Sequence, residues 1–224
     1  MIRIDVKNTI DIFASNAHFQ NVSNDNAYLR ESLGDVAAIA AGYPLRGAVD
    51  ELTSGDVAIV QMRNVDADSG VNWSEVQRIA LPSKRPPPFL AVGDIIFTTR
   101  GTRNFALALD TVDGQAVCSP HFFVIRVLDA NRIAPAFLAW QINQRAAQEY
   151  FQREATGSHI LNIRREVIEN LPVAIPPVAT QHIIVELADA ARSERASLTK
   201  LIENRNQQLE AIALGLATPE RHHA

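Results

Sequence analysis

The last third of the chain constrains its fold most strongly. A short apolar run ends in Pro176-Pro177, and a helical pattern follows from about residue 180 to residue 216. The two prolines favour an extended connection, because proline has no backbone N–H and disfavours a helical residue before it. A helix of about 35 residues is about 50 Å long at 1.5 Å per residue, which is more than a small domain can cover. We therefore expect a helical arm that projects from its domain.

Apolar residues recur along this arm in alternating steps of four and three. This spacing is typical of a coiled-coil seam, so the sequence predicts that the arm pairs with another helix. Glu194, Arg205 and Gln208 interrupt the seam, which favours an antiparallel or a different partner helix over an ideal two-stranded zipper. The alternative is a helix that packs back on its own domain, which the length disfavours. The predicted dimerisation residues are Leu187, Ala191, Leu198, Leu201 and Ile212.

The remainder of the chain is predicted to be an α+β body. Short apolar, β-branched runs bounded by glycine, proline or polar residues predict strands. Pro135 predicts a helix start, with apolar residues at helical spacing until Gly157. We expect a body over 1–178, with 1–30 as a leader or edge strand, a long helix over 179–218 and a tail over 219–224. The predicted strands lie at 31–42, 57–62, 95–97, 105–109, 115–118, 122–128, 160–163 and 168–175.

Composition excludes several classes of protein. The 224 residues are 47% hydrophobic and 21% charged, as in ordinary globular proteins, and no run of 18 apolar residues suits a membrane span. The first residues lack the apolar stretch of a signal peptide. Cys118 is the single cysteine, so an intramolecular disulfide and a cysteine-based zinc cluster are excluded. We expect a cytoplasmic protein without a membrane partner.

No pattern in the sequence points to catalysis. The six histidines lack the spacings that place two metal ligands on one helix face, and no phosphate-binding loop or methyl-donor motif is present. Ser119 and His121 are close in sequence, but a catalytic triad depends on geometry in space. The sequence therefore predicts no catalytic residue, no metal and no cofactor.

Positive charge is concentrated in two regions of an otherwise acidic chain. The net charge is −4, which argues against non-specific coating of nucleic acid. Residues 75–103 hold five basic and two acidic residues, as do residues 132–165, whereas residues 1–74 hold five basic and ten acidic residues. This pattern favours a partner on one face of the body, and chance scatter over a solvated surface is the alternative.

Several short motifs resemble those of type I restriction–modification specificity subunits. The run Gly93-Asp94-Ile95-Ile96-Phe97, followed by Thr99-Arg100-Gly101, is similar to the family's "GDIlf…rG" signature, and the resemblance extends over roughly residues 33–216. It implies a protein that binds DNA and carries methyltransferase subunits, without chemistry of its own. Full-length members have two target-recognition domains and two long helices, so this chain resembles a half-subunit whose dimer rebuilds that arrangement. Further matching motifs are Gly42-Tyr43-Pro44, residues 60–65, Gly157-Ser158, Asn162-Ile163, residues 171–177 and Gln181.

Polar residues on loops flanked by glycine or following strands are the candidate DNA contacts. Arginine pairs with guanine through two hydrogen bonds and asparagine pairs with adenine, so these side chains suit the reading of base edges. Lys84 and Arg85, or Arg164 and Arg165, suit phosphate contacts, with surface salt bridges as the alternative. The predicted DNA-binding residues are Arg46, Arg63, Asn64, Lys84, Arg85, Thr99, Arg100, Thr102, Arg103, Ser158 and His159.

The resulting hypothesis is a non-catalytic DNA specificity subunit that dimerises through its arm. Its expected partners are double-stranded DNA, adenine methyltransferase subunits and a second copy of the chain, with a restriction subunit as a further partner. A protein–protein adaptor of the same fold without DNA specificity is the main alternative, and an enzyme of unrecognised type is a third.

Overall fold

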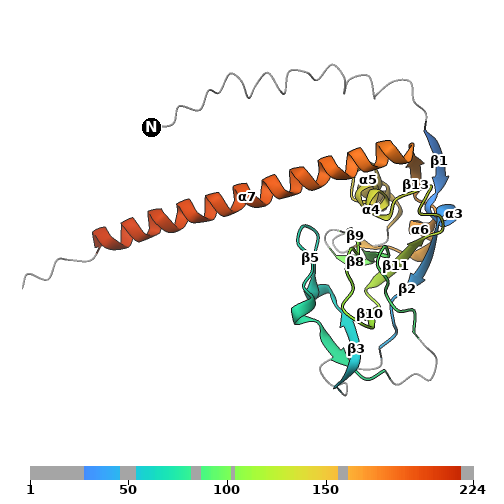
Figure 1. Ribbon diagram of the computed structural model, residues 1–224, viewed down its shortest axis with the longest axis horizontal. Helices are drawn as coiled ribbons and strands as arrows, with labels where there is room; N and C mark the ends of the chain where they lie inside the picture. Colours follow the sequence, from blue (N-terminus) through green and yellow to red (C-terminus); the bar gives the residue numbers. More distant parts are fainter. Residues whose placement is uncertain (1–27, 46–53, 82–86, 102–103, 156–160, 218–224) are drawn as a thin grey trace, which may run out of the picture.

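A β-rich body and one long helix make up the chain. The computed structural model describes residues 28–45, 54–81, 87–101, 104–155 and 161–217. The long helix, α7 (Val178–Ala217), leaves one edge of the body and extends well beyond it (Figure 1). The predicted α+β architecture with a long C-terminal helix is confirmed.

A four-stranded antiparallel sheet forms the centre of the body. Its order is β2 (Ala37–Ala41), β11 (Phe122–Val127), β7 (Ile95–Thr98) and β9 (Ala106–Ala108). The two central strands, β7 and β11, are rich in β-branched and aromatic residues, which pack well on a pleated surface. Strand β7 follows a turn in which Gly93 has a φ of 87°, a conformation that glycine adopts without steric cost.

A second sheet of three strands packs against the first. Its order is β10 (Ala116–Cys118), β3 (Ser54–Val60) and β6 (Gln77–Ile79), with β10 and β3 parallel. Side chains alternate between the two faces of a strand, so each strand contributes to two layers of the core. Ile96 and Val124 face the second sheet, whereas Ile95 and Ile125 face the helices.

Short elements complete the body. Strand β1 (Leu29–Ser32) pairs with β13 (Pro172–Ile175), which connects the start of the described chain to the strand that precedes α7. The remaining elements are α3 (Leu33–Val36), the 3-10 turns η2 (Met62–Asn64) and η3 (Trp73–Glu75), the hairpin of β4 (Val65–Asp66) and β5 (Gly70–Val71), β8 (Arg100–Gly101), α4 (Pro135–Ile142), α5 (Arg145–Glu154), β12 (Leu161–Asn162) and α6 (Arg165–Glu169).

The structure corrects the prediction of one helix from Pro135 to Gly157. Two helices, α4 and α5, occupy this region, with the break at Asn143 and Gln144. The Asn143 side chain donates to the carbonyl of Ala106 at 2.7 Å and accepts from the N–H of Ala106 at 2.8 Å. Asn143 therefore caps the free edge of β9, a long-range contact that sequence periodicity does not report.

Two predicted strands are also partly helical. The region 31–42 contains the helical turn α3 between β1 and β2, and the run 168–175 begins inside α6 before it becomes β13. Val167, Ile168 and Leu171 are buried in the layer between the helices and the central sheet. A short apolar run of this kind suits a buried helix and a buried strand equally well.

Gln181 attaches the base of α7 to the body. Its side chain is fully buried, accepts from the N–H of Ala134 at 2.8 Å, and donates to the carbonyls of Arg132 at 2.9 Å and Pro176 at 2.8 Å. Ile184 and Val185 pack on the same core one turn later. Beyond Ala191 every residue of α7 whose side chain is described is exposed. The arm is therefore fixed at its base and projects without cover.

Candidate nucleic-acid interface

Ion pairing divides the arginines of the body into two groups. Arg78, Arg126, Arg132, Arg145 and Arg165 each pair with a carboxylate. Within the described residues, no ion pair involves Arg30, Arg100, Arg153 or Arg164, and all four side chains are exposed. Among the described arginines, those of the second group carry charge that no carboxylate in the described chain neutralises, so they are the stronger candidates for phosphate contacts.

Three of these unpaired arginines belong to one neighbourhood of the fold. Strand β8 pairs with β12 so that Arg100 lies opposite Asn162, two residues before Arg164. Arg164 is the residue that precedes α6, and Arg153 lies in the last turn of α5, which packs against α6. We refer to Arg100, Arg153 and Arg164 as the basic cluster. The register of one short strand pair brings together residues that are about 60 positions apart in the sequence.

The sequence analysis placed Arg100 among the predicted DNA contacts and Arg164 among the predicted phosphate contacts, whereas it did not single out Arg153. Arg153 lies on a helix, whereas most of the predicted contacts lie on glycine-flanked loops. The sequence analysis treated Arg164 and Arg165 as equivalent phosphate contacts. In the structure, however, Arg165 Nε donates to the Glu169 carboxylate at 2.7 Å. The i, i+4 spacing of Arg165 and Glu169 is the sequence signal that distinguishes the two arginines.

Two of the predicted contact residues serve the fold instead. Asn64 is only 3% exposed, and its amide accepts from the N–H of Gln61 at 3.0 Å and donates to the carbonyl of Glu75 at 3.0 Å. Thr99 is 7% exposed and donates to the carbonyl of His121 at 3.0 Å. Arg63 is exposed and donates to the Gln77 side chain at 3.0 Å. Asn64 and Thr99 therefore leave the set that we propose for DNA contact.

Seven predicted contact residues lie outside the described part of the chain. Thr102 and Arg103 follow Gly101, the last residue of β8, and Ser158 and His159 precede Leu161, which pairs with Gly101. Both sequence segments thus adjoin the strand pair that carries Arg100. The others in this set are Arg46, Lys84 and Arg85.

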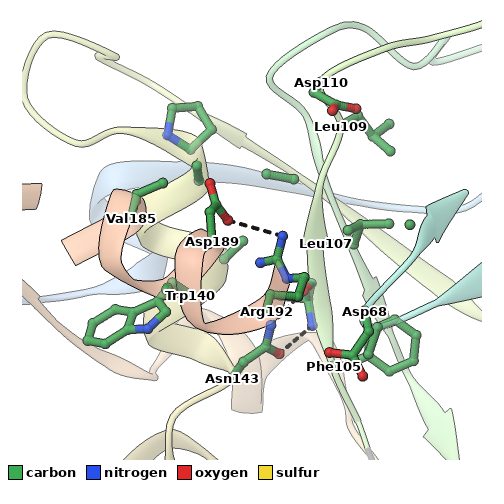
Figure 2. A pocket seen from close by; sticks show the side chains of 18 of the residues that line it. Asp68, Phe105, Leu107, Leu109, Asp110, Trp140, Asn143, Val185, Asp189 and Arg192 are labelled. Carbon is green, nitrogen blue, oxygen red and sulfur yellow. Dashed lines mark hydrogen bonds and ion pairs between the residues drawn. The ribbon is translucent and has the colours of Figure 1, made fainter. Parts of the chain in front are cut away.

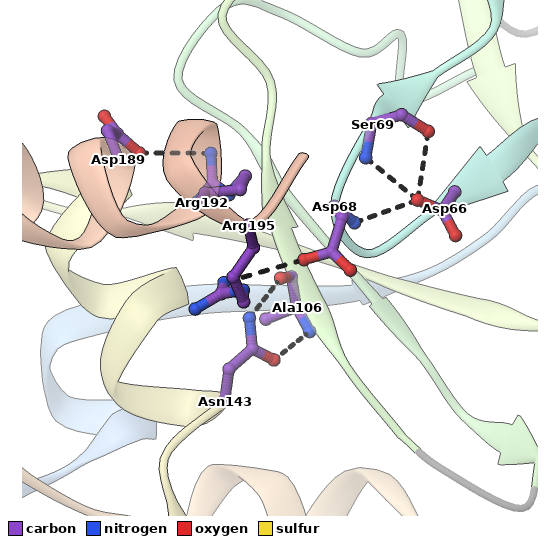
Figure 3. A network of polar contacts seen from close by, with 8 residues as sticks. All are labelled: Asp66, Asp68, Ser69, Ala106, Asn143, Asp189, Arg192 and Arg195. Carbon is purple, nitrogen blue, oxygen red and sulfur yellow. Dashed lines mark hydrogen bonds and ion pairs between the residues drawn. The ribbon is translucent and has the colours of Figure 1, made fainter. Parts of the chain in front are cut away.

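An open groove of about 1070 Å³ runs between the first half of α7, the β4–β5 hairpin and the edge of β9 (Figure 2). Its two arginines are matched by acids: Arg192 pairs with Asp189 at 3.1 Å, and Arg195 lies 3.9 Å from Asp68 at the hairpin tip (Figure 3). Asp110 also lines the groove, so its lining holds three acidic residues against two arginines and suits DNA phosphates less well than the basic cluster.

The hairpin tip is held by an aspartate turn. Asp66 Oδ1 accepts from the N–H groups of Asp68 and Ser69 at 3.0 and 2.9 Å and from the Ser69 hydroxyl at 3.0 Å (Figure 3). The Ser69 and Asp68 N–H groups are the main reason that the pKa of Asp66 lies below its usual value. This turn presents Asp68 to Arg195 and so links the hairpin to α7.

The described residues hold no metal-binding cluster, and their single cysteine is a poor nucleophile. No cluster of three or more histidine, cysteine or acidic side chains is placed to hold a metal in this part of the molecule. Burial raises the pKa of the Cys118 thiol to about 12, so it is protonated at neutral pH and a poor nucleophile. Within the same ranges, no helix has both the length and the apolar character that a bilayer span requires.

Four of the five predicted dimerisation residues of α7 are uncovered. Leu187, Leu198, Leu201 and Ile212 are 53–60% exposed, whereas Ala191 is half-buried and lines the groove. Exposed leucines recurring at heptad spacing on a projecting helix indicate a contact surface for another helix.

Comparison with known proteins identifies the family. The sequence profile of the type I restriction modification DNA specificity domain matches residues 31–211. The chain therefore belongs to the type I restriction modification DNA specificity domain family. A comparison with curated proteins gave no match.

Solved structures of specificity subunits from type I restriction–modification systems share this fold. The S subunit of a type I restriction–modification system from M. genitalium is 15% identical with a TM-score of 0.53, over 83% of this chain and 44% of that one. The HsdS subunit from Thermoanaerobacter tengcongensis is 20% identical with a TM-score of 0.60, over 89% of this chain and 52% of that one. A chain from a study of assembly and conformational transition in the type I R-M system is 20% identical with a TM-score of 0.64, over 88% and 51%. This chain thus spans about half the length of the solved subunits that it matches.

Proposed function

We propose that the chain is a half-length DNA specificity subunit of a type I restriction–modification complex. Two copies joined through α7 would present two target-recognition domains. The observation that carries the proposal is the architecture of one recognition domain followed by one 40-residue helix that is exposed beyond Ala191, in a chain about half as long as the solved subunits. A single copy leaves the apolar residues of α7 in water, and pairing removes that cost.

The basic cluster is the DNA-contacting surface in this proposal. Arg100, Arg153 and Arg164 lack acidic partners in the described chain and lie around the β8–β12 pair. Thr102, Arg103, Ser158 and His159 adjoin this pair in sequence and remain predicted contacts. Arginines on a strand pair and on helix ends give a rigid base for contacts with phosphates and base edges.

The proposed role is to position other subunits rather than to perform chemistry. In this view, adenine methyltransferase subunits dock on the dimer in the cytoplasm, and a restriction subunit binds the assembled complex. The net charge of −4 limits the affinity of the free dimer for DNA, since phosphate contacts dominate that affinity. We therefore expect DNA to bind more tightly once methyltransferase subunits are present.

Selection from a random duplex library tests the proposal. The purified chain is used alone and together with adenine methyltransferase subunits, and bound duplexes are sequenced after several rounds. A specificity subunit enriches a two-part sequence in the presence of the methyltransferase. Enrichment of no sequence, while the methyltransferase still binds the chain, would support the adaptor of the same fold instead.

A further inference from the structure

The short pair of β8 and β12 places Arg100 directly opposite Asn162. The N–H of Ile163 donates to the carbonyl of Thr99 at 2.9 Å, so Arg100 and Asn162 form the non-hydrogen-bonded type of antiparallel pair. In that type the two Cα atoms are about 4.5 Å apart, and the side chains lie close together on one face. Arg100 and Asn162 can therefore contact the same ligand.

Burial decides which way this face points. Thr99 and Ile163, which adjoin Arg100 and Asn162 along their strands, are buried. Side chains alternate between the two faces of a strand, so Arg100 and Asn162 point away from the body, where Arg100 is exposed and Asn162 is partly exposed. Arg164 is also exposed, and it lies two residues beyond Asn162 in extended backbone, with φ −78° and ψ 155°. We refer to Arg100, Asn162 and Arg164 as the outward face of the strand pair.

Buried polar contacts hold the segment that carries Arg100. Thr99 donates through both its N–H and its hydroxyl to the carbonyl of His121, at 2.9 and 3.0 Å. One residue earlier, the carbonyl of Thr98 accepts from the buried Asn104 amide at 2.7 Å. The outward face therefore stands on an ordered base, which lowers the entropic cost of holding a ligand.

The outward face combines positive charge with hydrogen-bond donors. Within the described residues, neither Arg100 nor Arg164 meets a carboxylate, and the Asn162 side chain has no hydrogen-bond partner. Diagonal neighbours across a strand pair, such as Arg100 and Arg164, are about 7–8 Å apart, so their like charges repel each other until an anion lies between them. A phosphate group suits this arrangement, because guanidinium groups bind its oxygens through paired hydrogen bonds and the amide adds a further donor.

A base edge suits the outward face less well than a phosphate. The edge of a guanine offers two acceptors to one guanidinium, but it is neutral. It would leave the repulsion between Arg100 and Arg164 in place, whereas the charge of one phosphate lowers it. The chemistry of the three side chains therefore favours the DNA backbone as the ligand.

We propose that the outward face holds one phosphodiester group of the DNA backbone, with Arg100 and Arg164 on its charged oxygens and the Asn162 amide as a neutral third donor. This inference rests on the proposed function. It adds Asn162 to the contact surface and separates a backbone anchor from the residues that read bases. Such an anchor is independent of sequence and fixes where the recognition domain lies along the duplex.

Replacement of single phosphates locates the anchor. The duplex enriched by the chain with methyltransferase subunits is synthesised with one neutral methylphosphonate at each backbone position in turn, and the affinity of the complex is measured. One position should cost the unmodified protein about tenfold in affinity. The double variant R100A/R164A should lose less than about twofold from the same replacement, because its contact is already absent. Arg30→Ala removes an exposed arginine on β1, in a different sheet, and should keep the full loss.

Variants of Asn162 distinguish a phosphate contact from a contact with a base. Asn162→Ala should weaken binding to every duplex by about threefold, and it should leave the enriched sequence and the salt dependence unchanged because Asn162 is neutral. Asn162→Asp keeps the shape but brings a carboxylate between the two arginines, so it should weaken binding by about thirtyfold or more. Asn170→Ala, at the exposed asparagine that ends α6, is the matched control and should change affinity little. The thermal midpoints of all variants should stay close to that of the unmodified chain, because none of these side chains is buried.

The outcomes separate the anchor from DNA recognition itself. A changed enriched sequence in Asn162→Ala or in R100A/R164A shows that the outward face reads a base, and it overturns the anchor. Equal sensitivity of R100A/R164A and the unmodified protein to every methylphosphonate overturns it as well, while the proposed function stands. A complex that enriches no sequence overturns the proposed function together with this inference, and that result is known before any phosphate is replaced.

Discussion

Asp94 and Arg126 form a bidentate ion pair between two neighbouring strands of the central sheet. The Arg126 Nε and Nη2 atoms donate to the two oxygens of Asp94, both at 2.6 Å. Asp94 Oδ2 also accepts from the N–H of Ala91 at 2.8 Å, and the Asp94 side chain is almost fully buried. The hydrogen bond to Asp94 is the main reason that the pKa of Arg126 lies above its usual value. The Gly93-Asp94 signature therefore fixes the turn that starts β7.

Loss of Arg126 should destabilise the fold. Arg126→Met leaves the buried carboxylate of Asp94 without its charged partner, and we expect the free energy of unfolding to fall by about 2 kcal/mol. The partial exposure of Arg126 keeps this below the cost of breaking a fully buried pair. Urea titration measures the change. In Arg78→Met, the partner Asp113 is exposed, so the loss should stay below about 1 kcal/mol, and equal losses would contradict this account.

Gln181 should control how firmly the arm is held. Gln181→Ala removes three hydrogen bonds and leaves the N–H of Ala134 and the carbonyls of Arg132 and Pro176 without a partner. We expect a cost of about 2–3 kcal/mol, concentrated at the base of α7. Hydrogen exchange of residues 178–190 should accelerate, whereas Gln207→Ala on the exposed part of the helix should leave it unchanged. No difference between the two variants would refute the anchoring role.

Gly42 should tolerate no side chain. A Cβ atom at this position would lie 2.0 Å from the carbonyl oxygen of Ser119, which belongs to the backbone and cannot move aside cheaply. Gly42→Ala should therefore lower the thermal midpoint by several degrees or prevent folding. Gly215→Ala in α7 meets nothing within 4 Å and should be neutral or stabilise the helix by up to about 1 kcal/mol. A neutral Gly42→Ala variant would disprove the close approach.

Arg164 and Arg165 should differ in their effect on DNA binding. Arg164 has no acidic partner in the described chain, whereas Arg165 pairs with Glu169. In the complex with methyltransferase, Arg164→Ala should weaken binding to all duplexes by about tenfold and reduce the salt dependence. Arg165→Ala should change affinity by less than about threefold. Arg153→Ala and Arg145→Ala form a second such pair, since Arg145 pairs with Glu149. Equal effects within each pair would remove the basic cluster from the interface.

The sequence by itself determined the elements whose signals are local. The strands around Ile59, Ile96 and Val124 were predictable from their apolar, β-branched runs, and α7 was predictable from its heptad spacing and the double proline before it. These signals depend on side-chain period and backbone restrictions within a few residues. The motifs that resemble the specificity family were also read from the sequence, and the family profile confirmed them.

Only the tertiary structure decided the roles of individual polar residues. Asn143 ends a helix because it caps β9, 37 residues earlier in the chain, and Asn64 and Thr99 bond within the body. Arg164 has no acidic partner in the described chain, whereas the charge of its neighbour Arg165 is neutralised by Glu169. The β8–β12 register brings Arg100 close to Arg164 in the fold. The physical reason is that hydrogen bonds and ion pairs depend on atoms meeting within about 3 Å, and long-range pairing sets those distances. Periodicity locates the elements, but strand register and burial decide which side chains remain free to bind.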